Sequence, residues 1–185
     1  MAAEWGIMRN DIESVLISAE EIQRKVAEMG RRISADYAGK EPVFVGVLKG
    51  CFIFMSDLMR NVDVNCTMDF MAVSSYSGTS TTGAVKINKD LSEDIEGRDV
   101  IIVEDILDSG ITLSYLKGYL LNRKPASIKI ATLMDKPARR RAEVYADYSC
   151  FEVPDAFVVG YGLDYNEKYR NLPYIGVLKP EIYEK

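Results

Sequence analysis

Three carboxylates lie within five residues of one another in this 185-residue chain: Glu104, Asp105 and Asp108. The first two directly follow the apolar run Val100–Val103, which would be buried in a folded domain. Carboxylates carried toward a protein interior are unfavourable unless they have partners. Their oxygens suit the paired hydroxyls of a sugar or a hard divalent cation such as Mg²⁺. We therefore expect a ligand site at this point of the chain.

The next residues are small and polar, and they begin a helical pattern. Backbone N–H groups at a helix start, together with the hydroxyls of Ser109 and Thr112, can cradle an anion, and Gly110 allows a close turn around it. The chain contains neither a G-x-x-x-x-G-K-[ST] nor a G-x-G-x-x-G motif. A plain helix start, with Asp108, Ser109 or Thr112 as the N-cap, is the alternative interpretation of this segment.

The chain contains no histidine and only three cysteines. The lack of histidine excludes Ser-His-Asp and Cys-His catalysis as well as zinc sites that use imidazole. Proton transfer then falls to Asp, Glu, Lys, Tyr or Cys, and a metal ion to carboxylate oxygens. Cys51, Cys66 and Cys150 are far apart and form no C-x-x-C pair, so we expect buried free thiols in a reducing compartment.

Charge and length narrow the class of protein further. The 23 basic and 28 acidic residues give a net charge of −5, which argues against a broad nucleic-acid surface. We expect the one basic cluster, Arg139–Arg141, to be a solvated face. No apolar run approaches the roughly 20 residues of a membrane span, and there is no signal-peptide pattern. We therefore expect one domain over residues 1–185 in the cytoplasm, with no membrane partner.

The elements that must position these residues alternate between helix and strand. Ser18 and Glu21 form a capping box for a helix with an apolar face, and the apolar runs Val43–Leu48 and Val100–Val103 predict buried, parallel strands. Further strands are expected over Asn65–Ser74, Ala84–Ile87, Ile128–Met134 and Ala156–Val159, and further helices over Cys51–Arg60 and around Leu113–Leu120. This order predicts an α/β fold, in which ligands bind at the carboxyl ends of the strands. Polar turns lie at three such ends, over 48–50, 104–112 and 135–141.

The segment Val100–Thr112 resembles the phosphoribosyl pyrophosphate signature of the type I phosphoribosyltransferases. Most of the remaining chain resembles the bacterial hypoxanthine-guanine phosphoribosyltransferase family. The stretches that carry this resemblance are Gly46–Gly50, Asp69–Tyr76, Leu133–Pro137 and Pro154–Glu167. The resemblance implies a parallel-rich twisted sheet flanked by helices, with a small hood made by the terminal segments. It also implies purine salvage, in which hypoxanthine or guanine and phosphoribosyl pyrophosphate give the nucleotide and pyrophosphate, with Mg²⁺, in a homodimer or homotetramer.

The resemblance assigns the sugar, phosphate and metal contacts to residues around the signature. Glu104 and Asp105 would hold the ribose hydroxyls and a magnesium site, and Asp164 would lie by a second magnesium. Asp108 would be the acid/base that faces N7 of the purine. The 5′-phosphate would lie in a cradle formed by Ser109, Gly110, Ile111 and Thr112.

The resemblance also assigns the leaving group and the base. Lys49 and Gly50 would bind pyrophosphate, with the Leu48–Lys49 peptide in the cis form, and Arg170 would meet the same group. Three residues would recognise the purine: Lys136 at its 6-oxo group, Phe157 by stacking, and Val158 through its backbone. The pair Ser75 and Tyr76 would lie on a loop that closes over the reaction.

A regulatory module on the same fold, which binds phosphoribosyl pyrophosphate and nucleic acid without catalysis, is the competing hypothesis. Its support in the sequence is the cluster Arg139–Arg141. The net charge, the carboxylate at Asp108 and the polar loop over 74–83 favour an enzyme instead. We therefore expect a transferase without a nucleic-acid partner.

Overall fold

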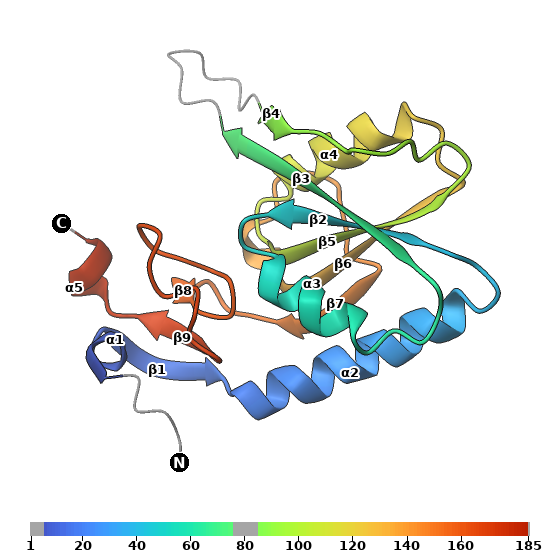
Figure 1. Cartoon of the computed structure of the whole chain (residues 1–185). Coiled ribbons are helices and arrows are strands. Elements are labelled where there is room, and N and C mark those ends of the chain that lie inside the picture. The colour runs from blue at the N-terminus through green and yellow to red at the C-terminus, as the bar shows by residue number, and fades with distance from the viewer. Residues whose placement is uncertain (1–5, 76–84, 185) are drawn as a thin grey trace.

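The computed structural model describes residues 6–75 and 85–184, which form two β-sheets with helices packed around them (Figure 1). The larger sheet has six strands. Their spatial order is β4 (Val85–Lys89), β3 (Thr67–Ser75), β2 (Val43–Leu48), β5 (Asp99–Leu107), β6 (Ser127–Asp135) and β7 (Tyr148–Glu152). All neighbours from β3 to β7 are parallel, and only β4 runs antiparallel, beside β3. The expectation of a mostly parallel α/β sheet is confirmed.

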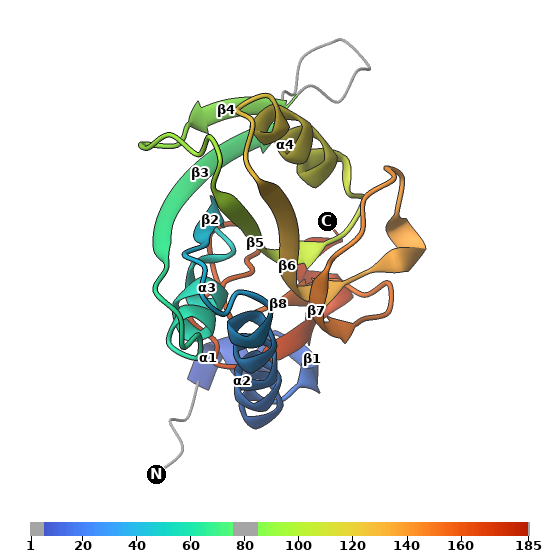
Figure 2. The ribbon, with the colours of Figure 1, turned by 90° about the vertical axis from the view of Figure 1, so that its right-hand side faces the viewer.

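Both faces of the central strands are buried, as their continuous apolar sequences predict. On one face, Val45 and Ile102 pack with Leu116 of helix α4 (Ile111–Leu121). On the other face, Phe44 and Val103 pack with residues of α2 (Ala19–Asp36) and α3 (Phe52–Met59). Figure 2 shows α4 on the side of the sheet opposite to α2 and α3. These two cores fix the carboxyl ends of β2 and β5 side by side.

The helix α2 begins as predicted. The Ser18 hydroxyl accepts a hydrogen bond from the Glu21 N–H at 3.2 Å, and the Glu21 carboxylate accepts one from the Ser18 N–H at 3.0 Å. Ile22, Val26 and Ile33 then lie fully buried on one face. No helix among residues 6–75 and 85–184 has both the length and the apolar character to cross a membrane.

Strand β5 is longer than the apolar run that predicted it. It continues through Glu104 and Asp105 to Leu107, because these residues keep their pairing with β6, Glu104 opposite Thr132 and Leu107 opposite Asp135. In contrast, the strand expected over Ala156–Val159 shortens to β8 (Val158–Val159). The carboxylates therefore belong to a rigid strand end.

The smaller sheet joins the two ends of the described chain. It has the order β1 (Ile12–Ile17), β9 (Ile175–Leu178) and β8, all antiparallel, and it is accompanied by the short helices α1 (Gly6–Asn10) and α5 (Pro180–Tyr183). In Figure 1 this sheet lies on the side to which the arrowheads of β2 and β5 point. The terminal segments thus face the carboxyl ends of the parallel strands.

The three cysteines are free thiols, as expected, but only Cys51 is buried, whereas Cys66 and Cys150 are partly exposed. Burial raises the pKa of the Cys150 thiol to about 12 and also raises the pKa of Cys51. These thiols are protonated at neutral pH, which does not suit a nucleophile.

Candidate active site

The carboxylate of Asp105 lies against the turn that follows β2. A Cβ atom added to Gly50 would lie 1.7 Å from Oδ2 of Asp105, so only glycine fits at this position. The peptide bond between Leu48 and Lys49, one residue earlier, is cis, as the resemblance implied. The structure therefore brings Lys49 and Gly50 together with Asp105.

Burial makes both strand-end carboxylates hard to ionise. It raises the pKa of Asp105 to about 6, although nearby hydrogen bonds and the charge of Arg170 act in the opposite direction. Burial and the adjacent charge of Asp105 raise the pKa of Glu104 well above its usual value. A positively charged partner would stabilise the ionised form of these two carboxyl groups.

A folded-back segment after β8 brings two further predicted residues to this place. Arg170 lies 2.8 Å from the Asp164 carboxylate and donates to the carbonyl oxygen of Gly162 at 2.7 Å. Gly162 has φ of +109°, and a Cβ there would lie 2.1 Å from the carbonyl oxygen of Gly50. The Nε of Arg170 is buried and has no hydrogen-bond partner among the described residues. An unpaired buried cationic N–H at this place suits an anionic ligand.

Lys49, in the turn after β2, also contacts the segment after β8 that carries Asp164 and Arg170. Its Nζ lies 3.1 Å from Oε2 of Glu167, and both side chains are mostly exposed. This ion pair spans the gap between the turn after β2 and the segment that carries Asp164 and Arg170. Its exposure makes it a weak contact that an anion can replace.

The segment between β5 and α4 has the geometry of an anion cradle. The N-cap of α4 is Gly110, with φ of +77°, and no side chain caps the helix. The capped-helix interpretation with Asp108, Ser109 or Thr112 as the N-cap is therefore wrong, because the turn requires a left-handed residue at position 110. Ile111 begins the helix, and its N–H donates a long hydrogen bond of 3.4 Å to the Ser109 hydroxyl.

A small pocket opens beside this cradle, and it gathers the residues assigned to acid/base chemistry and base recognition. It measures about 160 Å³ and is lined by Ile106, Asp108, Lys136, Arg139, Ala156, Phe157, Val158 and Leu163. This is smaller than the roughly 300–1,000 Å³ of pockets for drug-sized ligands, so it suits one small ring system.

The polar groups of this pocket have few partners. Oδ1 of Asp108 is buried without a hydrogen-bond partner in the described part of the chain, and its Oδ2 lies 3.9 Å from Nη1 of Arg139. Lys136 is buried and donates to the carbonyl oxygen of Ala156 at 2.8 Å. Burial lowers the pKa of the Lys136 ammonium, while the nearby charge of Asp108 acts to raise it. Both groups are poised to bind a polar ligand.

The ring of Phe157 lines the same pocket and is 39% exposed. It stacks on Tyr183 with ring centroids 4.6 Å apart, and Tyr165 meets it edge-on at 5.7 Å. Sequence reasoning gave no role to Tyr183, near the end of the chain, or to Tyr165, which lies within the stretch Pro154–Glu167. These contacts fix the orientation of Phe157 as an aromatic wall.

The loop residues are described only in part. Ser75 is the last residue of β3, and Tyr76 belongs to residues 76–84, outside the described residues. The expectation that both lie on a closing loop therefore stays a prediction.

The basic cluster Arg139–Arg141 is only in part the solvated face that its sequence predicts, because Arg139 and Arg141 are exposed but Arg140 is not. The side chain of Arg140 is only 15% exposed, pairs with Asp135 and donates to three backbone carbonyl oxygens. Arg139 is exposed and lies 2.6 Å from the carboxylate of Asp155. The cluster therefore does not support the hypothesis of a nucleic-acid-binding module.

The donor set at the strand end fits a hard divalent cation. Glu104, Asp105 and Asp164 offer only carboxylate oxygens, and burial disfavours the unpartnered charge on the first two. The described residues contain no ready group of three or more metal-binding side chains. Mg²⁺ that is held by one or two carboxylates together with substrate oxygens matches this arrangement.

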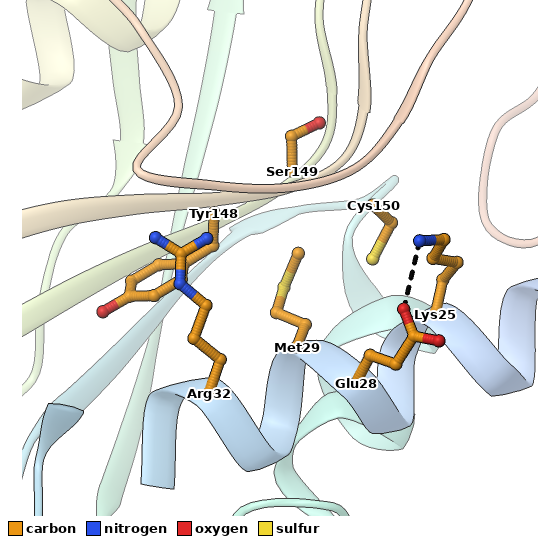
Figure 3. Close-up of a pocket in the computed structure, with 7 residues that line it drawn as sticks. All are labelled: Lys25, Glu28, Met29, Arg32, Tyr148, Ser149 and Cys150. Atoms are coloured by element: carbon orange, nitrogen blue, oxygen red, sulfur yellow. Dashed lines mark ion pairs between the residues drawn. The ribbon is translucent and has the colours of Figure 1, made fainter. Parts of the chain in front are cut away.

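A second hollow, of about 150 Å³, lies between α2 and β7, away from the strand carboxyl ends (Figure 3). Its charged side chains are engaged with other residues of its own wall: Lys25 pairs with Glu28 at 3.0 Å, and the Arg32 guanidinium lies 4.8 Å from the centroid of the Tyr148 ring. The charged groups of this hollow thus already have partners, in contrast to Oδ1 of Asp108 and Nε of Arg170, which have none among the described residues.

Comparison with known proteins identifies the family of the chain. The phosphoribosyl transferase domain family matches residues 17–166. The chain belongs to the phosphoribosyltransferase family, and the expected fold class is confirmed.

Individual proteins similar to the chain narrow its place within the family. The chain is 59% identical over 179 residues to the hypoxanthine-guanine phosphoribosyltransferase of Bacillus subtilis, covering 96% of this chain and 99% of that protein. A crystal structure of a hypoxanthine phosphoribosyltransferase from Staphylococcus aureus superimposes with a TM-score of 0.95 at 51% identity, covering 98% of this chain and 100% of that one. Within its family the chain thus falls among the hypoxanthine-guanine phosphoribosyltransferases.

The chain also matches a part of longer proteins. It is 58% identical over 179 residues to the bifunctional protein TilS/HprT of Listeria monocytogenes, where it spans 28% of the length of that protein.

Proposed function

We propose that this protein transfers the phosphoribosyl group of phosphoribosyl pyrophosphate to hypoxanthine or guanine, which gives IMP or GMP and pyrophosphate in purine salvage. The observation that carries the proposal is the pocket in which Asp108, Lys136 and Phe157 meet beside the N-terminus of α4. An aromatic wall, a buried cation and a carboxylate match a 6-oxopurine, and the helix N-terminus matches the 5′-phosphate of the phosphoribosyl group.

The base is held by complementary hydrogen bonds. The ammonium of Lys136 has only donors, so it suits the 6-oxo acceptor of hypoxanthine and guanine. The backbone of Val158 lies in the same wall and is available to read the edge of the ring. Asp108, which has one buried oxygen without a partner among residues 6–75 and 85–184, takes or returns the proton at N7 as the glycosidic bond forms or breaks.

The sugar and the leaving group lie at the end of β5. Glu104 and Asp105 hold the ribose hydroxyls, and the segment Ser109–Thr112 anchors the 5′-phosphate, so the binding energy positions the reacting carbon. Lys49, Gly50 and Arg170 bind the departing pyrophosphate.

The metal sites fall to Glu104 and Asp105, with Asp164 beside a second ion. Bound Mg²⁺ offsets negative charge on the pyrophosphate. All three carboxylates lie at the strand end or in the segment folded against it.

We also propose that the small sheet of β1, β9 and β8 is the hood of this single domain, 1–185, and that it encloses the base side of the site. The enzyme works in the cytoplasm as a homodimer or homotetramer, without nucleic-acid or membrane partners. Light scattering on a sizing column measures the assembly, and filter binding with RNA and DNA tests for a nucleic-acid partner.

The direct experiment is pyrophosphate release from phosphoribosyl pyrophosphate with one base at a time. Hypoxanthine and guanine should both support turnover, and adenine should be at least about 10-fold poorer. No release with any 6-oxopurine, from protein that binds phosphoribosyl pyrophosphate, would contradict the proposal.

A further inference from the structure

The guanidinium of Arg140 joins segments that meet at the carboxyl ends of β5 and β6. Its Nε donates to the carbonyl oxygen of Asp108 at 3.1 Å, and its Nη2 donates to that of Leu107 at 3.4 Å. Nη2 also donates to the carboxylate of Asp135, the last residue of β6. Nη1 donates to the carbonyl oxygen of Val144 at 2.5 Å. One largely buried side chain thus connects the end of β5, the end of β6 and the following loop.

The loop after Arg140 supports the same backbone. The carbonyl oxygen of Ser109 accepts hydrogen bonds from the N–H groups of Arg141 at 2.9 Å and Ala142 at 3.1 Å. A Cβ atom on Gly110 would lie 3.1 Å from Cδ of Arg140 and 2.6 Å from Cγ1 of Val144. The turn that opens the anion cradle therefore rests directly on the Arg140 segment.

The carboxylate of Asp108 is only loosely held by side-chain contacts. Its Oδ1 has no partner in the described ranges, and its nearest cation, Nη1 of Arg139, lies 3.9 Å from Oδ2 on an exposed side chain. The position of the carboxylate consequently follows from its own backbone, and Arg140 binds the carbonyl oxygen of that residue.

We propose that Arg140 is a positioning residue, which sets the place of the Asp108 carboxylate and the shape of the phosphate cradle through the backbone of residues 107–110. The inference rests on the proposed acid/base role of Asp108. A misplacement of about 1 Å in a catalytic group can lower a rate by about 10²-fold, so a group that fixes this backbone affects the chemical step without touching the substrate.

Lysine cannot replace arginine in this place. The planar guanidinium presents five N–H donors in fixed directions, and four acceptors surround it here. A lysine ammonium keeps the charge for Asp135 but is a single point that cannot reach the carbonyl oxygens on all sides. Arg140→Lys therefore removes the positioning while it retains the ion pair.

The test is a double-mutant cycle between Arg140→Lys and Asp108→Asn, with kcat expressed per folded molecule. Arg140→Lys should lower kcat about 10-fold or more in the wild-type background, but less than about 3-fold when Asp108 is already Asn, because coupled residues are not additive. Arg141→Lys, whose side chain is exposed, is the matched control and should change neither background. If Arg140→Lys does not fold, Asp135→Asn replaces it, because this variant weakens the contact between Arg140 and the Asp135 carboxylate.

If Arg140 has a purely structural role, Arg140→Lys lowers the melting temperature and lowers kcat by the same factor in the wild type and in Asp108→Asn. That result overturns the proposal. If Asp108→Asn retains wild-type turnover, the proposed role of Asp108 fails by itself. The affinity for IMP, measured by calorimetry, then tests whether Arg140 sets the shape of the phosphate cradle. Binding at least 5-fold weaker in Arg140→Lys, with Arg141→Lys unchanged, supports Arg140 as a positioning residue, and unchanged binding overturns it.

Discussion

Gly50 and Asp105 occupy positions so close that a Cβ atom on the glycine would lie 1.7 Å from Oδ2 of the carboxylate. The two residues come from the turn after β2 and from β5, adjacent parallel strands of the larger sheet. The contact fixes the spacing between the proposed pyrophosphate turn and the proposed ribose and metal carboxylates.

Gly50→Ala should lower kcat/KM for phosphoribosyl pyrophosphate by at least about 10-fold, because the methyl group must displace Asp105 or the turn. The matched control is Gly118→Ala in α4, where an added Cβ meets no atom of the described residues within 4 Å. That change should leave activity unaltered and stabilise the helix by about 0.5–1 kcal/mol. Steady-state kinetics and urea unfolding measure both effects, and equal activity of the two variants would contradict the assignment.

Asp108→Asn should lower turnover by about 10²–10⁴-fold, the usual contribution of a general acid/base, with little change in stability. The residue does not cap α4, whose N-cap is Gly110, so no helix cap is lost. Phosphoribosyl pyrophosphate should still bind, because the donors of the cradle are backbone groups. Single-turnover kinetics, melting temperature and calorimetry test the three parts. Wild-type turnover across the pH range, with chemistry rate-limiting, removes Asp108 from this role.

Lys136→Gln should narrow the preference for guanine over adenine. The wild-type protein should disfavour adenine by at least about 10-fold, because a buried ammonium facing a 6-amino donor leaves both groups unpaired. A glutamine amide has both a donor and an acceptor, so it accommodates either base. The ratio of kcat/KM for the two bases is the measurement, and Lys129→Gln, which lies at an exposed pair with Asp147, is the control. An unaltered ratio would show that another group reads position 6.

Excess chelator should abolish turnover, and added Mg²⁺ or Mn²⁺ should restore it. The same chelator should leave the melting temperature of the free protein unchanged, because the described residues form no ready cluster of three metal-binding side chains. Calorimetry should show weaker binding of phosphoribosyl pyrophosphate without the metal. Full turnover in chelator would refute the metal assignment of Glu104, Asp105 and Asp164.

Asp69→Asn should destabilise the protein by about 1–2 kcal/mol at pH 7, since Asp69 joins β3 to the segment after β4. Its carboxylate accepts hydrogen bonds from the N–H groups of Ser92 at 2.5 Å and Phe70 at 2.7 Å, and Lys89 lies 3.3 Å away. Burial acts to raise the pKa of Asp69, but these contacts outweigh it and the pKa is lowered.

A carboxyl group whose pKa is lower in the folded state stabilises the fold above its unfolded pKa of about 3.9, and this contribution is lost as the pH falls through the folded pKa. The difference between wild type and Asp69→Asn should therefore be largest near pH 7 and shrink below about pH 4. Urea unfolding across this range measures it, with the exposed Asp63→Asn as a control. A difference in unfolding free energy between the two proteins that grows as the pH falls would contradict a lowered pKa of Asp69.

The central strands β2 and β5 and the helix α2 could be predicted from sequence because their signals are local. Val43–Leu48 is apolar at every position but one, a pattern that two covered faces require, and it matches β2 without a shift. Strands β1 and β9 were not predicted. Only the ends of β1, Ile12 and Ile17, are buried, and irregular register interrupts the alternation that identifies a strand.

The site was predicted where residue type carries the chemistry, as with the carboxylates and Lys136. Arg140 was misread as a solvated charge because its partners are mainly backbone carbonyl oxygens, which leave no trace in residue types. Tyr183 escaped notice for a similar reason: its contact with Phe157 depends on how the C-terminal segment folds back.

The small sheet sets the order in which the molecule can be completed during synthesis. Strand β9 lies between β1 and β8, so neither of those strands has its neighbour until the ribosome has made residues 175–178. The large sheet needs only residues up to 152, so all of its strands are synthesised before β9. The wall formed by Phe157 and Val158 is backed by β9 and Tyr183, so the pocket for the base is finished last. The residues of the proposed phosphate cradle are therefore synthesised before those that complete the pocket for the purine.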